Sequence, residues 1–132
     1  MITGGPIGDD AGETAIAVID GDRGVLAAIG RLLRAYGFGV EGFASVEAFL
    51  ARERRVEPAC LVLDIELGGT SGFSLMHCLA AGDAPLPVIV VTSAEDETTR
   101  RRAYAAGCVA YLRKPFSAAA LIAAIETAVS DR

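Results

Sequence analysis

Short, mostly apolar runs alternate with helical segments along this chain, and this alternation most constrains its fold. The runs are four to six residues long, and each is followed by a segment with apolar residues at three- and four-residue steps. Such runs are typical of strands that are buried on both faces of a sheet. We therefore expect five strands, at residues 14–19, 39–43, 60–63, 88–91 and 109–112.

Capping residues indicate where the intervening helices begin and end. Gly37 and Gly107 follow helical segments, where a left-handed cap favours glycine. Ser45 and Ser117 are predicted to be N-caps, and the helix after Ser45 is expected to end at Glu57-Pro58. Because parallel neighbouring strands need crossover connections, five alternating strands and helices predict an α/β fold with a parallel sheet covered on both faces.

Length, charge and cysteine content exclude several classes of protein. The 132 residues suit one domain, predicted at 14–132, after a disordered tail at 1–13 that lacks the pattern of a signal peptide. None of the apolar runs is long enough to span a bilayer. The net charge of -5 disfavours non-specific binding to nucleic acid or anionic membranes. Cys60, Cys78 and Cys108 are predicted to be reduced core residues of a cytoplasmic protein.

Polar side chains follow four of the predicted strands. They are Asp20 and Asp22 after the first strand, Asp64 after the third, Thr92 and Ser93 after the fourth, and Lys114 after the fifth. Ligands of such sheets bind beyond the carboxyl ends of the strands. Carboxylates there can hold Mg²⁺ or act as nucleophiles, while a hydroxyl and an ammonium can bind phosphoryl oxygens. Lys114 is the only lysine, and its compact charge suits one oxygen better than the planar fork of arginine does.

In the order of its strands and of the polar residues that follow them, the chain resembles the receiver domain of bacterial two-component response regulators, over roughly residues 14–129. The matching motifs are Ile19-Asp20-Gly21-Asp22, Leu61-Val-Leu-Asp64 leading into Gly69-Thr-Ser-Gly72, Val90-Val-Thr92-Ser93, and Tyr111-Leu-Arg-Lys114-Pro115-Phe116. The resemblance, which extends to single-domain chemotaxis regulators, implies a doubly wound, flavodoxin-like (βα)5 sheet in strand order 2-1-3-4-5. It also implies a cis peptide bond before Pro115.

The resemblance implies a role for each of four residues. Asp64 is the expected phosphoacceptor, which takes a phosphoryl group from a histidine kinase or a histidine phosphotransfer protein. Thr92 resembles the switch hydroxyl, Tyr111 the aromatic residue that follows it inward, and Lys114 the partner of the phosphoryl oxygen. The expected function is a signalling phosphoacceptor that changes its surface conformation, not an enzyme, although self-phosphorylation from small donors is compatible with it. Homodimerisation through the last two helices is also compatible with the pattern.

The implied Mg²⁺ site departs from the family pattern. The family has two adjacent acids after the first strand, and here the second is Gly21. The remaining implied ligands are Asp20, Asp64 and the backbone carbonyl of Glu66. Asp22 could compensate, but it is better placed to cap the following helix. Because Mg²⁺ prefers six oxygen ligands and retains waters, the loss of one carboxylate predicts weaker binding.

Three alternatives remain open from the sequence. One is a pseudo-receiver that works through constitutive protein contacts, with impaired Mg²⁺-dependent phosphorylation. Asp20-Gly-Asp22 also resembles the motif of haloacid-dehalogenase phosphatases, but only Glu126 and Asp131 follow Lys114, where that family needs an acidic pair. A flavodoxin-like FMN carrier is disfavoured, because acids after the first strand would repel a phosphate. Direct DNA binding is not expected, because only one helix follows Pro115.

Overall fold

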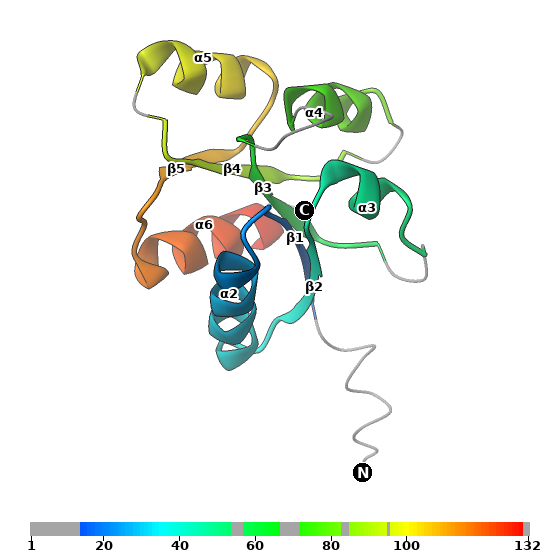
Figure 1. Ribbon diagram of the computed structural model, residues 1–132, viewed down its shortest axis with the longest axis vertical. Helices are drawn as coiled ribbons and strands as arrows, with labels where there is room; N and C mark the ends of the chain where they lie inside the picture. Colours follow the sequence, from blue (N-terminus) through cyan, green and yellow to red (C-terminus); the bar gives the residue numbers. More distant parts are fainter. Residues whose placement is uncertain (1–13, 54–56, 67–71, 83–84, 95, 131–132) are drawn as a thin grey trace.

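The computed structural model describes residues 14–53, 57–66, 72–82, 85–94 and 96–130. The predicted tail at 1–13, residues 69–71 of the glycine-rich motif and Asp131 lie outside these ranges. Within them, parallel strands form a five-stranded sheet in the order β2-β1-β3-β4-β5, which confirms the predicted topology (Figure 1). The strands are β1 (Ala15–Ile19), β2 (Gly39–Phe43), β3 (Cys60–Asp64), β4 (Val88–Thr92) and β5 (Ala110–Arg113).

Helices cover both faces of the sheet. In the described ranges they are α2 (Arg23–Ala35), α3 (Val46–Leu50), α4 (Gly72–Ala80), α5 (Glu97–Ala105) and α6 (Ala118–Ser130). α2 and α6 lie on one face, and α3, α4 and α5 lie on the other (Figure 1). Successive strand residues point to opposite faces, so Ala17 and Ile19 pack under α3 to α5, while Ile16 and Val18 pack under α2 and α6. None of the described helices has the length and apolar character needed to cross a membrane.

The predicted caps are present, with one helix shorter than expected. Gly37 and Gly107 have φ angles of 89° and 103°, and the hydroxyls of Ser45 and Ser117 each accept a backbone amide hydrogen bond of 3.0 Å. The first of these serines caps α3, which ends at Leu50 and does not extend to Pro58 as predicted.

Arg52 accounts for the early end of α3. Its Nη1 donates to the carbonyl oxygen of Phe49 at 3.0 Å, and its guanidinium lies 4.0 Å from the centroid of the Phe49 ring. The same guanidinium forms an ion pair of 3.0 Å with Glu57. The Phe49 carbonyl therefore accepts both this guanidinium and, at 3.2 Å, the backbone amide of Arg52, three residues later, as in the tightened last turn of a helix.

The prediction that all three cysteines lie in the core was wrong for one of them. Cys60 and Cys108 are buried, but Cys78 is exposed on α4. α4 buries Phe73 and Met76, and the period of 3.6 residues turns position 78 to the opposite side. An apolar neighbourhood in the sequence therefore did not imply burial.

Candidate functional site

The carboxyl ends of β3, β4 and β5 meet at one edge of the sheet. Asp64 pairs with Val91 of β4, and Thr92 pairs with Arg113 of β5. Lys114 follows β5 directly, and its amide donates to the carbonyl oxygen of Thr92 at 2.8 Å. Parallel register therefore brings residues from three separate segments to one place.

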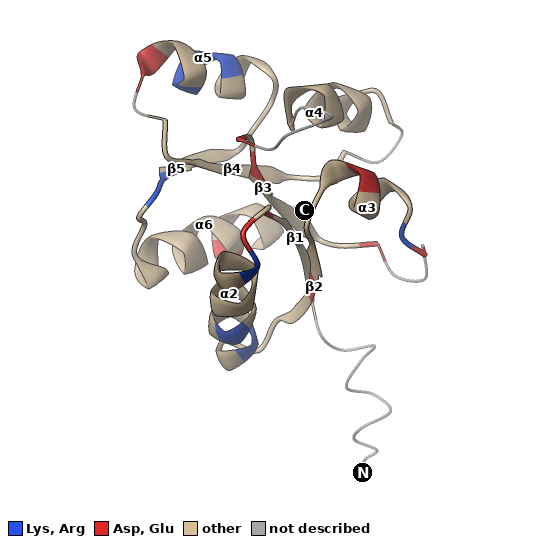
Figure 2. Cartoon of the chain, viewed as in Figure 1, with Lys and Arg blue, Asp and Glu red and all other residues tan. Residues whose placement is uncertain are grey.

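Lys114 joins two buried carboxylates. Its Nζ lies 2.8 Å from Oδ2 of Asp20 and 3.4 Å from Oδ2 of Asp64. These two aspartates and Thr92 are the buried polar or charged residues of the described part of the chain. Figure 2 shows the acidic residues where β1 and β3 end. The peptide bond between Lys114 and Pro115 is cis, as the resemblance implied.

Burial and neighbouring groups shift the pKa values of Asp64 and Lys114. Burial is the largest influence on Asp64 and raises its pKa, and the charge of Asp20 raises it further against the lowering effects of the Glu66 amide and Lys114. Burial alone would lower the pKa of Lys114, but the hydrogen bond to Asp20 and the charges of Asp64 and Asp20 outweigh it, so the pKa is raised. Lys114 therefore carries its charge at neutral pH.

Asp22 points to the helix and not to the carboxylate pair. Its Oδ1 accepts hydrogen bonds from the amides of Gly24 at 2.8 Å and Val25 at 3.2 Å, which makes it the N-cap of α2. Its own amide donates to Oδ1 of Asp20 at 2.9 Å. Asp22 thus orients the Asp20 carboxylate through its backbone while its side chain caps the helix.

Glu66 contributes a side-chain interaction that was not predicted. The amide of Ser93 donates to Oε1 of Glu66, and the hydroxyl of Ser93 donates to the same oxygen at 2.8 Å. These two hydrogen bonds are the main reason that the pKa of Glu66 is lowered, with smaller contributions from the hydroxyl of Thr92 and the charge of Lys114. The clue in the sequence was an acid two residues after Asp64, beside a strand that ends in Thr92 and Ser93.

Tyr111 lies on β5, and its hydroxyl is buried without a hydrogen-bond partner among the described residues. Burial is the largest influence on this phenol and raises its pKa. Its ring lies 6.4 Å from that of Tyr104 on α5, measured between centroids. Within the described part of the chain, packing therefore holds this side chain.

The donor set fits a hard cation such as Mg²⁺. Asp20 and Asp64 present carboxylate oxygens at the same edge, and the backbone carbonyl of Glu66 lies two residues beyond Asp64. Oxygen ligands of this kind suit Mg²⁺, which tolerates few protein ligands because it retains waters. Across the described residues, no cluster of three or more His, Cys, Asp or Glu side chains could hold a metal.

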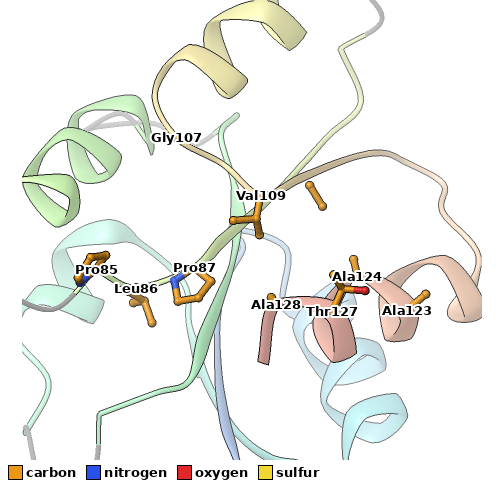
Figure 3. Close-up of a pocket in the computed structure, with 10 residues that line it drawn as sticks. Pro85, Leu86, Pro87, Gly107, Val109, Ala123, Ala124, Thr127 and Ala128 are labelled. Carbon is orange, nitrogen blue, oxygen red and sulfur yellow. The ribbon is translucent and has the colours of Figure 1, made fainter. Parts of the chain in front are cut away.

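A separate pocket of about 590 Å³ lies at the opposite edge of the sheet (Figure 3). It is lined mainly by apolar residues that include Leu86, Pro87, Val109 and Ala124, and none of its lining residues is charged. This pocket therefore offers no charged side chain to a ligand, unlike the carboxyl edge.

Comparisons with known proteins agree with this geometry. The family model for the response regulator receiver domain matches residues 16–126. The response regulator protein TmoT of Ectopseudomonas mendocina is 32% identical over 89% of this chain and 53% of its own length. The transcriptional regulatory protein FixJ of Bradyrhizobium diazoefficiens is 33% identical over 86% of this chain and 56% of its own length. The chain thus spans about half the length of these relatives.

Solved structures show the same similarity. The crystal structure of FixJ-N has a TM-score of 0.80 and 31% identity, and the alignment covers 89% of this chain and 94% of that one. The crystal structure of a response regulator receiver protein from Burkholderia phymatum has a TM-score of 0.79 and 34% identity, with coverage of 89% and 96%.

Proposed function

Since this chain belongs to the response regulator receiver domain family, we propose that it accepts a phosphoryl group on Asp64 and thereby changes its surface conformation. The donor is a phosphohistidine of a histidine kinase or of a histidine phosphotransfer protein. One observation carries the proposal: a single ammonium, Lys114, lies between two buried carboxylates at the carboxyl edge of the sheet.

The proposed transfer uses Asp64 as the nucleophile. A carboxylate oxygen attacks the phosphorus, the P–N bond to the donor imidazole breaks with its electron pair going to nitrogen, and an acyl phosphate forms. Lys114 is held more closely by Asp20 than by Asp64, so its ammonium stays beside the reacting carboxylate and can bind a phosphoryl oxygen. Bound Mg²⁺, held by Asp20, Asp64 and the carbonyl of Glu66, would supply further neutralisation of the phosphoryl charge.

The signal would pass from Asp64 through Thr92 to Tyr111. The hydroxyl oxygen of Thr92 accepts the amide of Ala94 at 3.0 Å, and its proton contributes to the lowered pKa of the Glu66 carboxylate, so this proton would have to turn from Glu66 to a phosphoryl oxygen. Tyr111 has no polar partner to lose among the described residues when its neighbour moves. Phosphorylation would then shift the balance between two arrangements of this edge.

The donor protein would approach across the groove beside Lys114. This groove has a volume of about 720 Å³ and is lined mainly by apolar residues of α2 and of the segment after β5, including Ile29, Leu32, Pro115 and Phe116. Because the groove adjoins Lys114, which pairs with Asp64, an apolar surface beside the phosphohistidine is the partner that fits.

Intact-mass measurement after incubation with acetyl phosphate and Mg²⁺ tests the proposed function. We expect one phosphoryl adduct, and we expect none in Asp64→Asn. Absence of an adduct in the native chain at high Mg²⁺ would contradict the proposal, and an adduct on Asp20 would favour phosphatase-like chemistry instead.

The second candidate is a pseudo-receiver that acts through constitutive contacts. It is favoured by Gly21, which stands where the family pattern has a second acid. In that case the chain would bind its target equally well before and after treatment with acetyl phosphate.

A further inference from the structure

The side chain of Glu66 engages hydrogen-bond donors that a phosphoryl group on Asp64 would need. A phosphoryl group has three terminal oxygens, each a strong acceptor. The donors close to Asp64 are the ammonium of Lys114, the hydroxyl of Thr92, and the amide and hydroxyl of Ser93, all at the ends of β4 and β5. The carboxylate of Glu66 already accepts both donors of Ser93.

We propose that the Glu66 carboxylate is a built-in anion that occupies the Ser93 end of the phosphoryl position, and that phosphorylation must displace it. The proposal rests on the proposed function, because it assumes that Asp64 is the acceptor. Two anions cannot share the same two donors without repulsion at such short range. Glu66 therefore lowers the affinity of the site for a phosphoryl group and opposes spontaneous occupation.

The displacement is physically accessible. Glu66 is exposed, so its side chain can rotate into solvent without disturbing the core. Rotation breaks two hydrogen bonds to a charged acceptor, and water replaces them, so the net penalty is modest. Substitution of the side chain leaves the backbone carbonyl in place, which separates this effect from metal binding by that carbonyl.

Beryllofluoride with excess Mg²⁺ is the probe, and its apparent Kd is followed by the NMR shifts of the Ser93 and Lys114 amides. Glu66→Ala is expected to bind about three- to tenfold more tightly than the native chain. Glu66→Asp should also bind more tightly, although it keeps the charge, because it is one methylene too short to reach Ser93. Glu126→Ala removes an exposed charge from α6 and should leave the Kd unchanged.

The outcomes separate this inference from the proposed function. Equal affinity of Glu66→Ala and the native chain would overturn the inference while leaving phosphorylation intact. If Glu66→Ala binds more tightly but Glu66→Asp binds with native affinity, the negative charge at this position explains the effect without occupation of the Ser93 donors. That result would also overturn the inference. Failure of the native chain and the variants alike to bind beryllofluoride or to form an adduct with acetyl phosphate would overturn both proposals.

Discussion

Removal of the ammonium group of Lys114 should destabilise the fold, and the loss should depend on pH. In Lys114→Met, the buried carboxylates of Asp20 and Asp64 lose the cation that they share. At distances of 2.8 and 3.4 Å and an effective dielectric constant of about 20, the two attractions amount to about 6 and 5 kcal/mol before desolvation. The cost of desolvating the charges offsets most of this attraction. We therefore expect the free energy of unfolding to fall by about 2–3 kcal/mol near pH 7.5. This is less than is usual for breaking a fully buried ion pair, because the Lys114 side chain is 23% exposed.

The sign of the pH dependence follows from Asp64. Its pKa is already raised by burial, and the loss of Lys114 removes an influence that lowers it. A carboxyl group whose folded pKa lies above its unfolded pKa favours folding below the unfolded pKa, and this contribution is lost as the pH rises through the folded pKa. The destabilisation should therefore be smaller at pH 4.5 than at pH 7.5.

Urea unfolding of both proteins at the two pH values measures this difference. Arg101→Met, which removes an exposed cation from α5, is the control and should change the free energy of unfolding by less than about 0.5 kcal/mol. Lys114→Met/Asp20→Asn should recover part of the loss, because one unpaired carboxylate is removed. An equal loss at both pH values, or no recovery in the double variant, would refute the reasoning.

Three further predictions concern the metal, the lysine and the cysteines. Gly21→Asp should tighten Mg²⁺ binding about tenfold by adding a carboxylate beside Asp20, and an unchanged Kd in calorimetry would contradict the placement of that residue. Lys114→Arg keeps the charge but presents a planar fork, so phosphorylation by acetyl phosphate should slow at least about tenfold, and a native rate would show that charge alone suffices. Ellman's reagent at pH 8 should label Cys78 rapidly and Cys108 only on unfolding, because Cys108 is buried and its pKa is raised to about 11. Rapid labelling of two or more thiols in the folded protein would argue against this prediction.

Much of the fold could be predicted because its strongest sequence patterns are local. β3 and β4 are fully buried, so their apolar runs are continuous, and Asp64 and Thr92 end them in the sequence as they do in the structure. The end of α3 could not be predicted, because Arg52 folds back onto Phe49 and the hydrophobic pattern contains no information about that contact.

The unpredicted part of the site is non-local. Glu66 and Ser93 are 27 residues apart, and their hydrogen bonds depend on the register between β3 and β4. Strand positions alone place both residues at one edge but do not say which way the carboxylate points. For the same reason the sequence does not predict that Lys114 lies closer to Asp20 than to Asp64.

The hydroxyl of Tyr111, which has no hydrogen-bond partner among the described residues, has an energetic consequence for the resting population. A buried hydroxyl without a partner costs about 1–3 kcal/mol relative to one that is satisfied. A second rotamer that places the phenol against water or a carbonyl would gain up to that free energy, less the packing it gives up, and about 1–3 kcal/mol corresponds to a factor of about 5 to 150 in population. Even before any phosphoryl group arrives, the chain is therefore expected to sample more than one arrangement at β5, with relative populations set in part by this one oxygen atom.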